Sequence, residues 1–497
     1  MKDFIENNKQ SIKWLVLILW SCLSIYTAFH HEIWRDEMRA LSLAIQHSTL
    51  TQLYHNLTNE GHPILWYLIL KGFYSFYSDT VILKLVSFII GFSSVALFLF
   101  HIRVSLPIAI LFCFSNIMMW ENTISCRNYG IAALLIMLFS IFYDRHKYFL
   151  ASLMLVLLAQ SNLIGLLVAM MLMGYMQIRF YQNRIFTILG SMVYPLMVLF
   201  SMWFFYITTK PNELSLVVPF SEKNLATLLN HFVQSIFYPS KVLHPFIPDL
   251  PIVSALIIYM LTFYFSKDKW LAFIFYMSVV LLNFLCLEFN MISTRHTGVF
   301  LVFLFFLIHQ YNDSQIEGNR LTEWAFKLGK NILLPLMCIS LFISNLIFCY
   351  RDVTTKMSNS KELGEFISSH PRYKDAIIIG ESDYTLEGIP YYVRNKFYIP
   401  REKRFGNYTH FTRENAREIS MSEIIKNCDS LTSIDGKICL FVASQPIAFG
   451  IDQKIKIPYY VEKYFTIRKE DFYRLRKIAE FKDAYYKDEN FTLYEIQ

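Results

Sequence analysis

Charged residues are scarce in this sequence. Asp, Glu, Lys and Arg make up only 17% of its 497 residues, whereas 55% are hydrophobic and the mean hydropathy is +0.36. A soluble domain typically carries about 25% charged residues, so this deficit excludes an ordinary soluble fold. The net charge of +7 comes from Lys and Arg scattered through short loops. That pattern orients membrane helices, and we expect no nucleic-acid partner.

Recognisable cysteine and glycine motifs are also missing. Of the eight cysteines, only Cys428 and Cys439 lie outside the apolar segments and their edges. They could form a disulfide if that part of the chain is exported. No CxxC or His/Cys spacing indicates a zinc site, and no GxGxxG or P-loop follows a predicted strand. The sequence also has no internal repeat.

Long apolar runs dominate the first 350 residues. The first run, 12–29, lacks a small-residue cleavage site, so we expect a signal anchor. Runs of this kind are typical of transmembrane helices, and they predict an all-α polytopic membrane core over residues 1–350. The later runs cover residues 62–78, 80–100, 105–119, 129–143, 147–160, 163–178, 184–208, 252–266, 270–288, 297–311 and 331–350.

Basic residues in short loops predict the orientation. Lys and Arg precede the first run and cluster near 144–147, 179–184 and 267–269, which should therefore be cytoplasmic. The loops 30–61, 120–128, 209–251 and 288–296 then face outward, as does the C-terminal part. A cytoplasmic N-terminus and an external C-terminus need an odd number of crossings. We predict eleven, with 62–100 crossing once, or thirteen if a long segment splits.

Residues 351–497 predict a small extracytoplasmic α/β domain. Ala376–Gly380 and Lys437–Ala443 have the pattern of buried strands, and Ser420–Lys426 that of a short helix. Turn residues between aromatic runs over Lys482–Glu495 predict a hairpin.

The first external loop, 30–61, holds two adjacent carboxylates, Asp36 and Glu37, directly after an outward-going span. The pattern from Asp36 to Ala44 is helical, so Asp36 should lie at or near the helix start. Taken alone, these carboxylates are better explained as a charged helix start at the membrane surface. The chemical alternative is a general base at the outer membrane surface.

Cationic side chains recur at the outer ends of later spans. Arg127 follows Glu121 in the turn 120–128 and precedes Tyr129, and Arg295-His296 begins another span. An arginine there can bind a lipid phosphate through two parallel hydrogen bonds. Interfacial anchoring is the alternative, but cations are least favoured on the outer side. Lys84 lies within an apolar run, where a charge snorkels or faces a polar partner.

The order of these features resembles the GT-C superfamily of membrane glycosyltransferases. The likeness is greatest to the branch of protein O-mannosyltransferases and of bacterial aminoarabinose and related polyprenyl-phosphate-sugar transferases. The matching segments are Trp34-Arg35-Asp36-Glu37, His62-Pro63-Ile64-Leu65-Trp66-Tyr67, Lys84-Leu85-Val86-Ser87, Cys126-Arg127-Asn128-Tyr129 and Arg295-His296. Ile64 replaces a second proline of the family pattern, and residues 351–497 match no acceptor-recognition domain.

The resemblance implies a GT-C-like core that transfers a sugar from a polyprenyl-phosphate donor. The acceptor would be an envelope glycan, a lipid or a protein at the outer face of a bacterial inner membrane. Asp36 would be the catalytic base, with Glu37 beside it. Donor phosphate would be bound by Arg127, Lys84, Arg295 and His296. Further substrate contacts would come from His62, Glu121 and Tyr129. Family members differ in metal use, so a divalent cation at Asp36, Glu37 and Glu121 stays open.

Two other classes remain open. A membrane transporter also places ionisable residues in its spans, but it needs no large external domain, and the sequence shows no repeat. A non-catalytic scaffold or lipid flippase subunit could use the same helical core.

The predicted topology is testable with reporters fused after Tyr350. Alkaline phosphatase fused there should be active, because the positive-inside pattern places this point outside. A fully active cytoplasmic reporter at the same point would contradict both the topology and the external position of the site.

Overall fold

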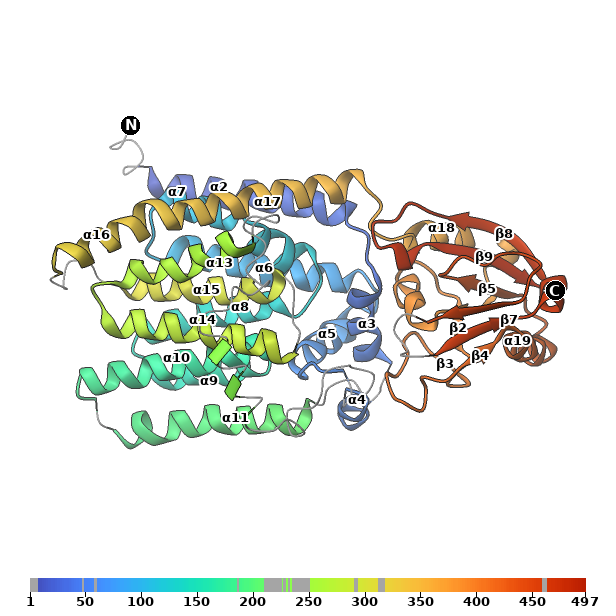
Figure 1. The fold of residues 1–497 in the computed structure, drawn as a ribbon, viewed down its shortest axis with the longest axis horizontal. Coiled ribbons are helices and arrows are strands. Elements are labelled where there is room, and N and C mark those ends of the chain that lie inside the picture. Colours follow the sequence, from blue (N-terminus) through green and yellow to red (C-terminus); the bar gives the residue numbers. More distant parts are fainter. Residues whose placement is uncertain are drawn as a thin grey trace.

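The computed structural model describes residues 8–46, 49–57, 60–185, 187–209, 251–289, 294–311, 318–457 and 463–497, with a few residues between 226 and 234. Most of the expected external loop 209–251 and the middle of 288–296 lie outside the described residues. A helical bundle is followed by a sheet-containing C-terminal domain that caps one of its ends (Figure 1).

The bundle consists of long helices that lie alongside one another (Figure 1). Apart from the amphipathic α16, their sequences are mostly apolar on all faces, so each can be buried against neighbours or lipid. The helices are α2 Lys9–His30, α6 Ile82–His101, α7 Leu106–Cys113, α8 Tyr129–Asp144, α9 Tyr148–Ala159, α10 Leu163–Gln182, α11 Tyr194–Thr208, α13 Pro251–Met260, α14 Lys269–Phe289, α15 Thr294–Gln310, α16 Arg320–Leu328 and α17 Leu334–Thr354.

Among the described residues, six helices are long and apolar enough to cross a membrane, or seven if a bent pair counts as one span. The stretch 62–100 supplies one of them, α6, because α5 (Leu65–Phe76) has only 12 residues. This agrees with a single crossing there. Shorter apolar helices lie at 148–159, 256–265 and 295–310. Whether these also cross, as eleven crossings require, stays a prediction.

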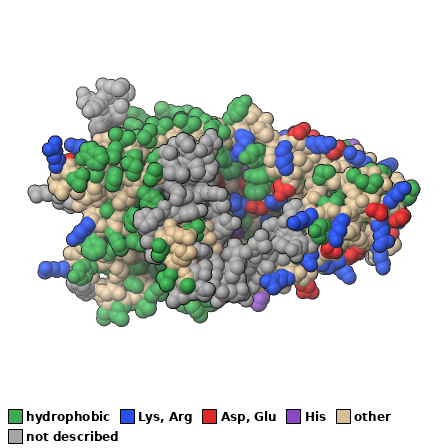
Figure 2. Space-filling model, viewed as in Figure 1, with side chains coloured by type: hydrophobic (Ala, Val, Ile, Leu, Met, Phe, Trp, Pro, Cys, Tyr) green, Lys and Arg blue, Asp and Glu red, His purple; other side chains and the backbone are tan. Residues whose placement is uncertain are grey.

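The two ends of the bundle differ in charge. The start of α2 and the basic connections lie at one end, and the C-terminal domain lies at the other (Figures 1 and 2). Arg179 donates to Asp268 at 2.9 Å, which joins two of the basic connections directly. The basic connections therefore gather at the end of the bundle opposite to the C-terminal domain.

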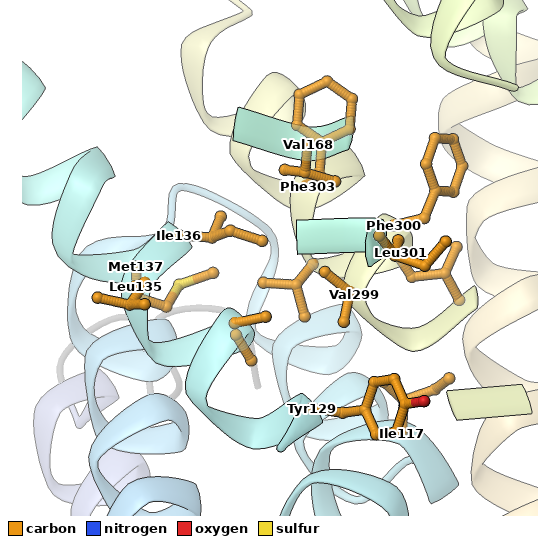
Figure 3. Close-up of a cluster of buried hydrophobic side chains, with 14 of the residues drawn as sticks. Ile117, Tyr129, Leu135, Ile136, Met137, Val168, Val299, Phe300, Leu301 and Phe303 are labelled. Carbon is orange, nitrogen blue, oxygen red and sulfur yellow. The ribbon is translucent and has the colours of Figure 1, made fainter. Parts of the chain in front are cut away.

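Aromatic and branched side chains fill the centre of the bundle. Figure 3 shows Ile117, Tyr129 and Ile136 near Val299 and Phe300. Phe300 is fully buried and its ring centroid lies 5.6 Å from that of Phe275 on α14. Burying a large apolar side chain contributes about 1.5–3 kcal/mol. Such packing holds α8 and α15 in fixed positions relative to each other.

A sharp break precedes α8. The segment 106–124 ends in the π-helix η1 (Asn116–Ile124), and the chain then turns by 113° into α8. Gly130 makes the turn possible, because an added Cβ would lie 2.3 Å from the main-chain oxygen of Asn122. The break places residues 125–128, and thus Arg127, at the domain end of the bundle.

Three short helices lie between the bundle and the C-terminal domain (Figure 1). They are α3 (Arg35–Ile45), α4 (Leu50–Asn56) and α5. Residues 37–44 of α3 are all buried, although the segment includes Glu37 and Arg39. Buried charges need partners, so α3 is held by ion pairs from both sides.

The C-terminal domain is built on a six-stranded sheet of order β3-β2-β1-β5-β9-β8, in which β1 runs parallel to β2 and β5. A three-stranded sheet, β4-β7-β6, lies beside it. The elements are α18 Ser360–Ser369, β1 Ile377–Glu381, β2 Lys396–Ile399, β3 Arg404–Phe405, β4 Ile419–Ser420, α19 Met421–Asp435, β5 Cys439–Ala443, β6 Gln453–Lys456, β7 Tyr464–Ile467, β8 Leu475–Phe481 and β9 Phe491–Ile496.

The carboxyl edge of the parallel strands faces the bundle. The 3-10 helix η9 (Asp383–Tyr391) follows β1 and packs against α3. An added Cβ at Gly388 would lie 3.1 Å from the main-chain nitrogen of Arg35, so the two backbones nearly touch. Ligands of open α/β sheets bind beyond this edge, and here the edge covers the first external loop.

The strands predicted at 376–380 and 437–443 are β1 and β5, shifted by one or two residues. The helix predicted at 420–426 is α19, which continues to Asp435. The predicted hairpin exists as β8–β9, but its position over 482–495 was wrong, since β8 ends at Phe481. Exposed charges on β8, an edge strand, hide its apolar pattern.

Replacement of Gly130 by alanine tests the close approach at the break. We expect Gly130→Ala to lower thermal stability by about 1–3 kcal/mol, because the main chain of Asn122 must move. Gly174→Ala is the matched control, since a Cβ there meets nothing within 4 Å in the middle of α10. Equal melting temperatures for the two variants would contradict the packing described.

Candidate functional site

Asp36 lies in the first turn of α3 and does not cap the helix. The cap residue is Trp34, whose main-chain N–H donates to the Glu37 carboxylate at 3.3 Å. Two carboxylates in a first turn are favoured by the helix dipole. Neighbouring positions on a helix point about 100° apart, and the two side chains accordingly find different partners.

Asp36 is paired with the arginine of the break before α8. The Arg127 guanidinium donates to Oδ2 of Asp36 at 2.8 Å, and Arg35 Nε lies 3.5 Å from Oδ1. Burial alone would raise the pKa of this carboxyl. The charges of Arg127, then Arg35 and Arg295, instead hold the pKa of Asp36 well below its usual range. The side chain stays 34% exposed, so a substrate can reach it.

Glu37 points the other way, into a fully buried cluster. Its carboxylate accepts from Nε2 of His31 at 3.0 Å. Nδ1 of His31 lies 3.2 Å from Asp352 on α17, which also accepts from the Trp120 indole at 2.5 Å. Burial would lower the pKa of His31, but Glu37 and Asp352 raise it to about 10. His31 is therefore a cation between two carboxylates.

Glu37 also fixes the main chain beside Arg127. Its Oε1 accepts from the main-chain N–H of Cys126 at 3.0 Å. The adjacent carboxylates thus act on one turn in two ways: Asp36 binds the Arg127 side chain, and Glu37 binds the backbone that carries it. This explains why both acids are present at consecutive positions.

A recess of about 640 Å³ opens beside Asp36. Charged side chains gather at this junction of bundle and domain (Figure 2). The lining residues come from α3, the loop before α5, the first turn of α5, the break before α8 and the C-terminal domain; they are Asp36, Arg39, Ala40, Glu60, His62, Trp66, Tyr67, Arg127, Asn128 and Phe411.

Arg39 ties the recess to the C-terminal domain. It binds Glu60 through Nε at 2.9 Å and through Nη2 at 2.5 Å, and Nη1 donates to Glu387. Nη2 also donates to the main-chain oxygen of Thr409 at 2.8 Å, and the guanidinium lies 4.1 Å from the Phe411 ring. A buried arginine shared by two carboxylates fixes the domain over α3.

A second tie runs through the start of α3. Arg35 donates to Asp488, and its main-chain N–H lies 3.4 Å from Glu489. Trp34 stacks on Tyr486 with ring centroids 4.4 Å apart. Burial raises the pKa of Glu489 to about 8. The helix that carries Asp36 is thus positioned by the C-terminal domain as much as by the bundle.

Two further predicted residues, His62 and Arg295, lie close to Asp36. Burial, together with the charges of Arg127 and Arg295, lowers the pKa of His62 to about 4, so the imidazole is neutral. Nε of Arg295 is buried without a hydrogen-bond partner. The Arg295 guanidinium lies 5.8 Å from the ring of Tyr129, whose hydroxyl is 3.1 Å from Nε2 of His296. A cationic donor buried without a partner suits an anionic ligand.

Lys84 and Glu121 lie outside the lining of the recess. Nζ of Lys84 donates to the main-chain oxygens of Ala28 and His31 at 2.9 and 2.8 Å, where it closes the end of α2. Glu121 is buried within η1. The positions of Lys84 and Glu121 therefore do not support the predicted contacts with a substrate.

A divalent cation does not fit the acidic trio considered from the sequence. Asp36 is neutralised by Arg127 and Arg35, and Glu37 by His31, so a metal would lie among cations. Glu121 does not share the recess with Asp36. Hard cations prefer several free oxygen ligands, which these engaged carboxylates do not provide.

Ligand-type atoms of His101, Asp144 and His309 gather within 4.8 Å at the opposite end of the bundle. Nδ1 of His309 accepts the main-chain N–H of Arg103 at 3.0 Å, so the ring proton lies on Nε2 and is donated to Asp144 at 2.6 Å. A metal on Nε2 would move that proton to Nδ1, against the Arg103 N–H. The hydrogen bonds indicate that these three side chains link the ends of α6, α8 and α15 and do not form a metal site.

The sequence analysis did not identify several residues of the site. Arg39 lies one turn after Asp36, and Glu60 directly precedes the Gly-His-Pro start of α5, so spacing alone offered a weak signal. Glu387 and Phe411 offered none, because only the docking of the domain brings them to α3.

No family model and no curated protein matches this chain. Among solved structures, the chain is similar to the crystal structure of ArnT from Cupriavidus metallidurans bound to undecaprenyl phosphate. The sequence identity is 10%, the TM-score is 0.49, and the similarity covers 98% of each chain. So remote a likeness says nothing about the residues of the site.

The buried His31 cation predicts a stability that falls with rising pH. Between the ordinary histidine pKa of 6.5 and about 10, the folded protein keeps a proton that the unfolded chain has lost. Each such proton costs about 1.4 kcal/mol of stability per pH unit in this window. The melting temperature should therefore fall from pH 7 to pH 9.5 more steeply in the wild type than in His31→Gln. Parallel curves would show that His31 is neutral in the fold.

Proposed function

We propose that the chain is a GT-C-like glycosyltransferase that moves a sugar from a polyprenyl-phosphate donor to an envelope glycan, lipid or protein acceptor. Transfer takes place at the outer face of the membrane and inverts the anomeric centre. The observation that carries the proposal is the Asp36–Arg127 pair, which faces a recess at the domain end of the bundle. Arg295, whose Nε is buried without a hydrogen-bond partner, lies nearby.

The two arginines suit a lipid phosphate. Arg127 follows η1 and Arg295 begins α15, so both lie where a headgroup at the outer membrane surface would sit. Guanidinium groups bind phosphate oxygens in pairs. The phosphate is the leaving group, and it needs stabilisation of negative charge rather than protonation. Because His62 is neutral, the positive charge that stabilises the phosphate comes from the arginines.

Asp36 is the proposed base. The acceptor hydroxyl gives its proton to the Asp36 carboxylate while its oxygen attacks the anomeric carbon. The bond from that carbon to the phosphate oxygen breaks, and polyprenyl phosphate leaves with the electron pair. Before donor binds, the Arg127 contact makes Asp36 a weak base. A donor phosphate competes for Arg127, and the shared charge raises the proton affinity of Asp36.

Glu37 is a positioning residue in this scheme. Fully buried between His31 and the Cys126 N–H, it cannot reach a substrate in the recess. Its contribution is the position of the turn that presents Arg127.

Asp36→Asn tests the base directly. The amide keeps size and hydrogen bonding but cannot accept the proton, so the transfer rate should fall about a hundred- to ten-thousandfold. The measurement is transfer of labelled sugar in membranes that hold equal amounts of each protein. Glu37→Gln is the matched control and should lower thermal stability more than rate. An Asp36→Asn rate above about a tenth of wild type would place the base elsewhere. A dead Glu37→Gln beside an active Asp36→Asn would reverse the roles.

Arg127→Ala tests the phosphate contact. Loss of a charge-assisted hydrogen bond should slow turnover by roughly one to two decades with little effect on expression. Arg127→Lys should recover only part of the rate, because a lysine cannot form the paired contact. Wild-type turnover in Arg127→Ala would move the phosphate role to Arg295 or Lys84.

A further inference from the structure

Two cysteines meet in the core of the C-terminal domain. Cys428 lies in the middle of α19 and Cys439 begins β5, and each side chain is only 1% exposed. Both are free thiols in the structure. We propose that the two thiols are oxidised in the cell to a disulfide that links α19 to the six-stranded sheet; the inference rests on the proposed position of the domain outside the membrane.

The alternation of side chains along β5 directs Cys439 towards α19. Cys439 and Phe441 belong to the same cluster of buried side chains as Cys428, whereas Leu440 belongs to the cluster on the opposite face of the sheet. Ile424, four residues before Cys428, also belongs to the first cluster. Residues four apart lie on one face of a helix, so the buried face of α19 carries Cys428 towards the start of β5.

The two thiols are in direct contact. A hydrogen bond with the Cys439 thiol, followed by burial, raises the pKa of the Cys428 thiol. Between the two residues, Gly436 ends α19 with a φ of 63° and turns the chain back into β5. Disulfide sulfurs are about 2 Å apart. Thiols already in hydrogen-bond contact can reach that separation by small side-chain movements, without moving either backbone.

The oxidant that the reaction needs is the disulfide of an exported thiol oxidoreductase. The thiolate of one cysteine attacks that disulfide and forms a mixed disulfide, which the thiolate of the other cysteine then displaces. Two S–H bonds break and one S–S bond forms. Two electrons and two protons pass to the oxidoreductase, which leaves as a dithiol. Such bonds persist in extracytoplasmic domains and are rare in the cytosol.

Burial determines when this reaction can take place. The nucleophile is the thiolate, and in the folded domain the Cys428 thiol is inaccessible and has a raised pKa. The disulfide must therefore form while the domain folds, before α19 covers the start of β5. The same burial then protects the bond from reductants. Thiols of this pair can be counted only after the protein is denatured.

The test is a count of thiols in the full-length protein, taken from cells quenched with acid to stop thiol exchange. The denatured protein is treated with N-ethylmaleimide, with or without prior reduction, and its intact mass gives the number of labels. We expect two labels fewer without reduction. Trypsin without reductant should release peptide 427–437 joined to peptide 438–454, lighter than their sum by two hydrogen atoms.

Single substitutions assign the bond to its cysteines. Cys428→Ser should take up the same number of labels with and without reduction, because Cys439 then has no partner. Cys338→Ser is the matched control. It removes another buried cysteine, on α17, which packs against the helix α7 that carries Cys113. The difference of two labels should persist in Cys338→Ser, and its loss there would place the bond in the bundle and overturn the proposal.

The remaining outcomes separate the disulfide from the transferase. Equal numbers of labels in the reduced and unreduced wild type would overturn the disulfide, whether or not the protein transfers sugar. Free thiols together with an active alkaline phosphatase fusion would overturn the disulfide and leave the external position of the domain intact. A disulfide in a protein that transfers no sugar would sustain the inference and refute the transferase.

Discussion

The neutralisation of two adjacent carboxylates on α3 determines how the rest of the structure is arranged. Asp36 and Glu37 could not lie at the junction of bundle and domain without cations, because burying an unpaired charge is costly. Arg127 and His31 supply them from opposite sides. The break before α8, the end of α2 and the end of α17 are held in place by these contacts. Loss of His31 would leave the carboxylates of Glu37 and Asp352 buried without a cation.

The C-terminal domain is part of the same electrostatic system. Arg39 and Arg35 of α3 form ion pairs with Glu387 and Asp488 of the domain. The domain therefore fixes the helix that presents Asp36. Because η9 follows β1, the carboxyl edge of the parallel strands packs against α3 in the loop 30–61. The recess therefore has one wall from the bundle side and one from the domain. A transporter would have no need of such an arrangement, whereas an enzyme that joins a membrane donor to an acceptor would.

Local pattern was enough to predict the bundle, the α/β domain and the candidates Asp36, Arg127 and His62. The length of the apolar runs, the charge of the loops and the order of the motifs can all be read from residues that are consecutive in the sequence. The role of Lys84 stays a prediction, because a lysine that closes the end of α2 and one that binds phosphate look alike in a sequence. Glu387 and Phe411 were invisible, since they reach α3 only after the domain docks. The edge strand β8 was missed because its exposed charges break the apolar pattern.

The most direct test is a cryo-EM structure of the protein in nanodiscs with polyprenyl phosphate. The account predicts that the phosphate lies within hydrogen-bond distance of both Arg127 and Arg295, with the Arg127–Asp36 contact lengthened from its 2.8 Å in the ligand-free protein. Asp36 should remain open to the recess. A phosphate bound elsewhere, such as at Lys84 or at the far end of the bundle, with the Arg127–Asp36 pair unchanged would contradict it.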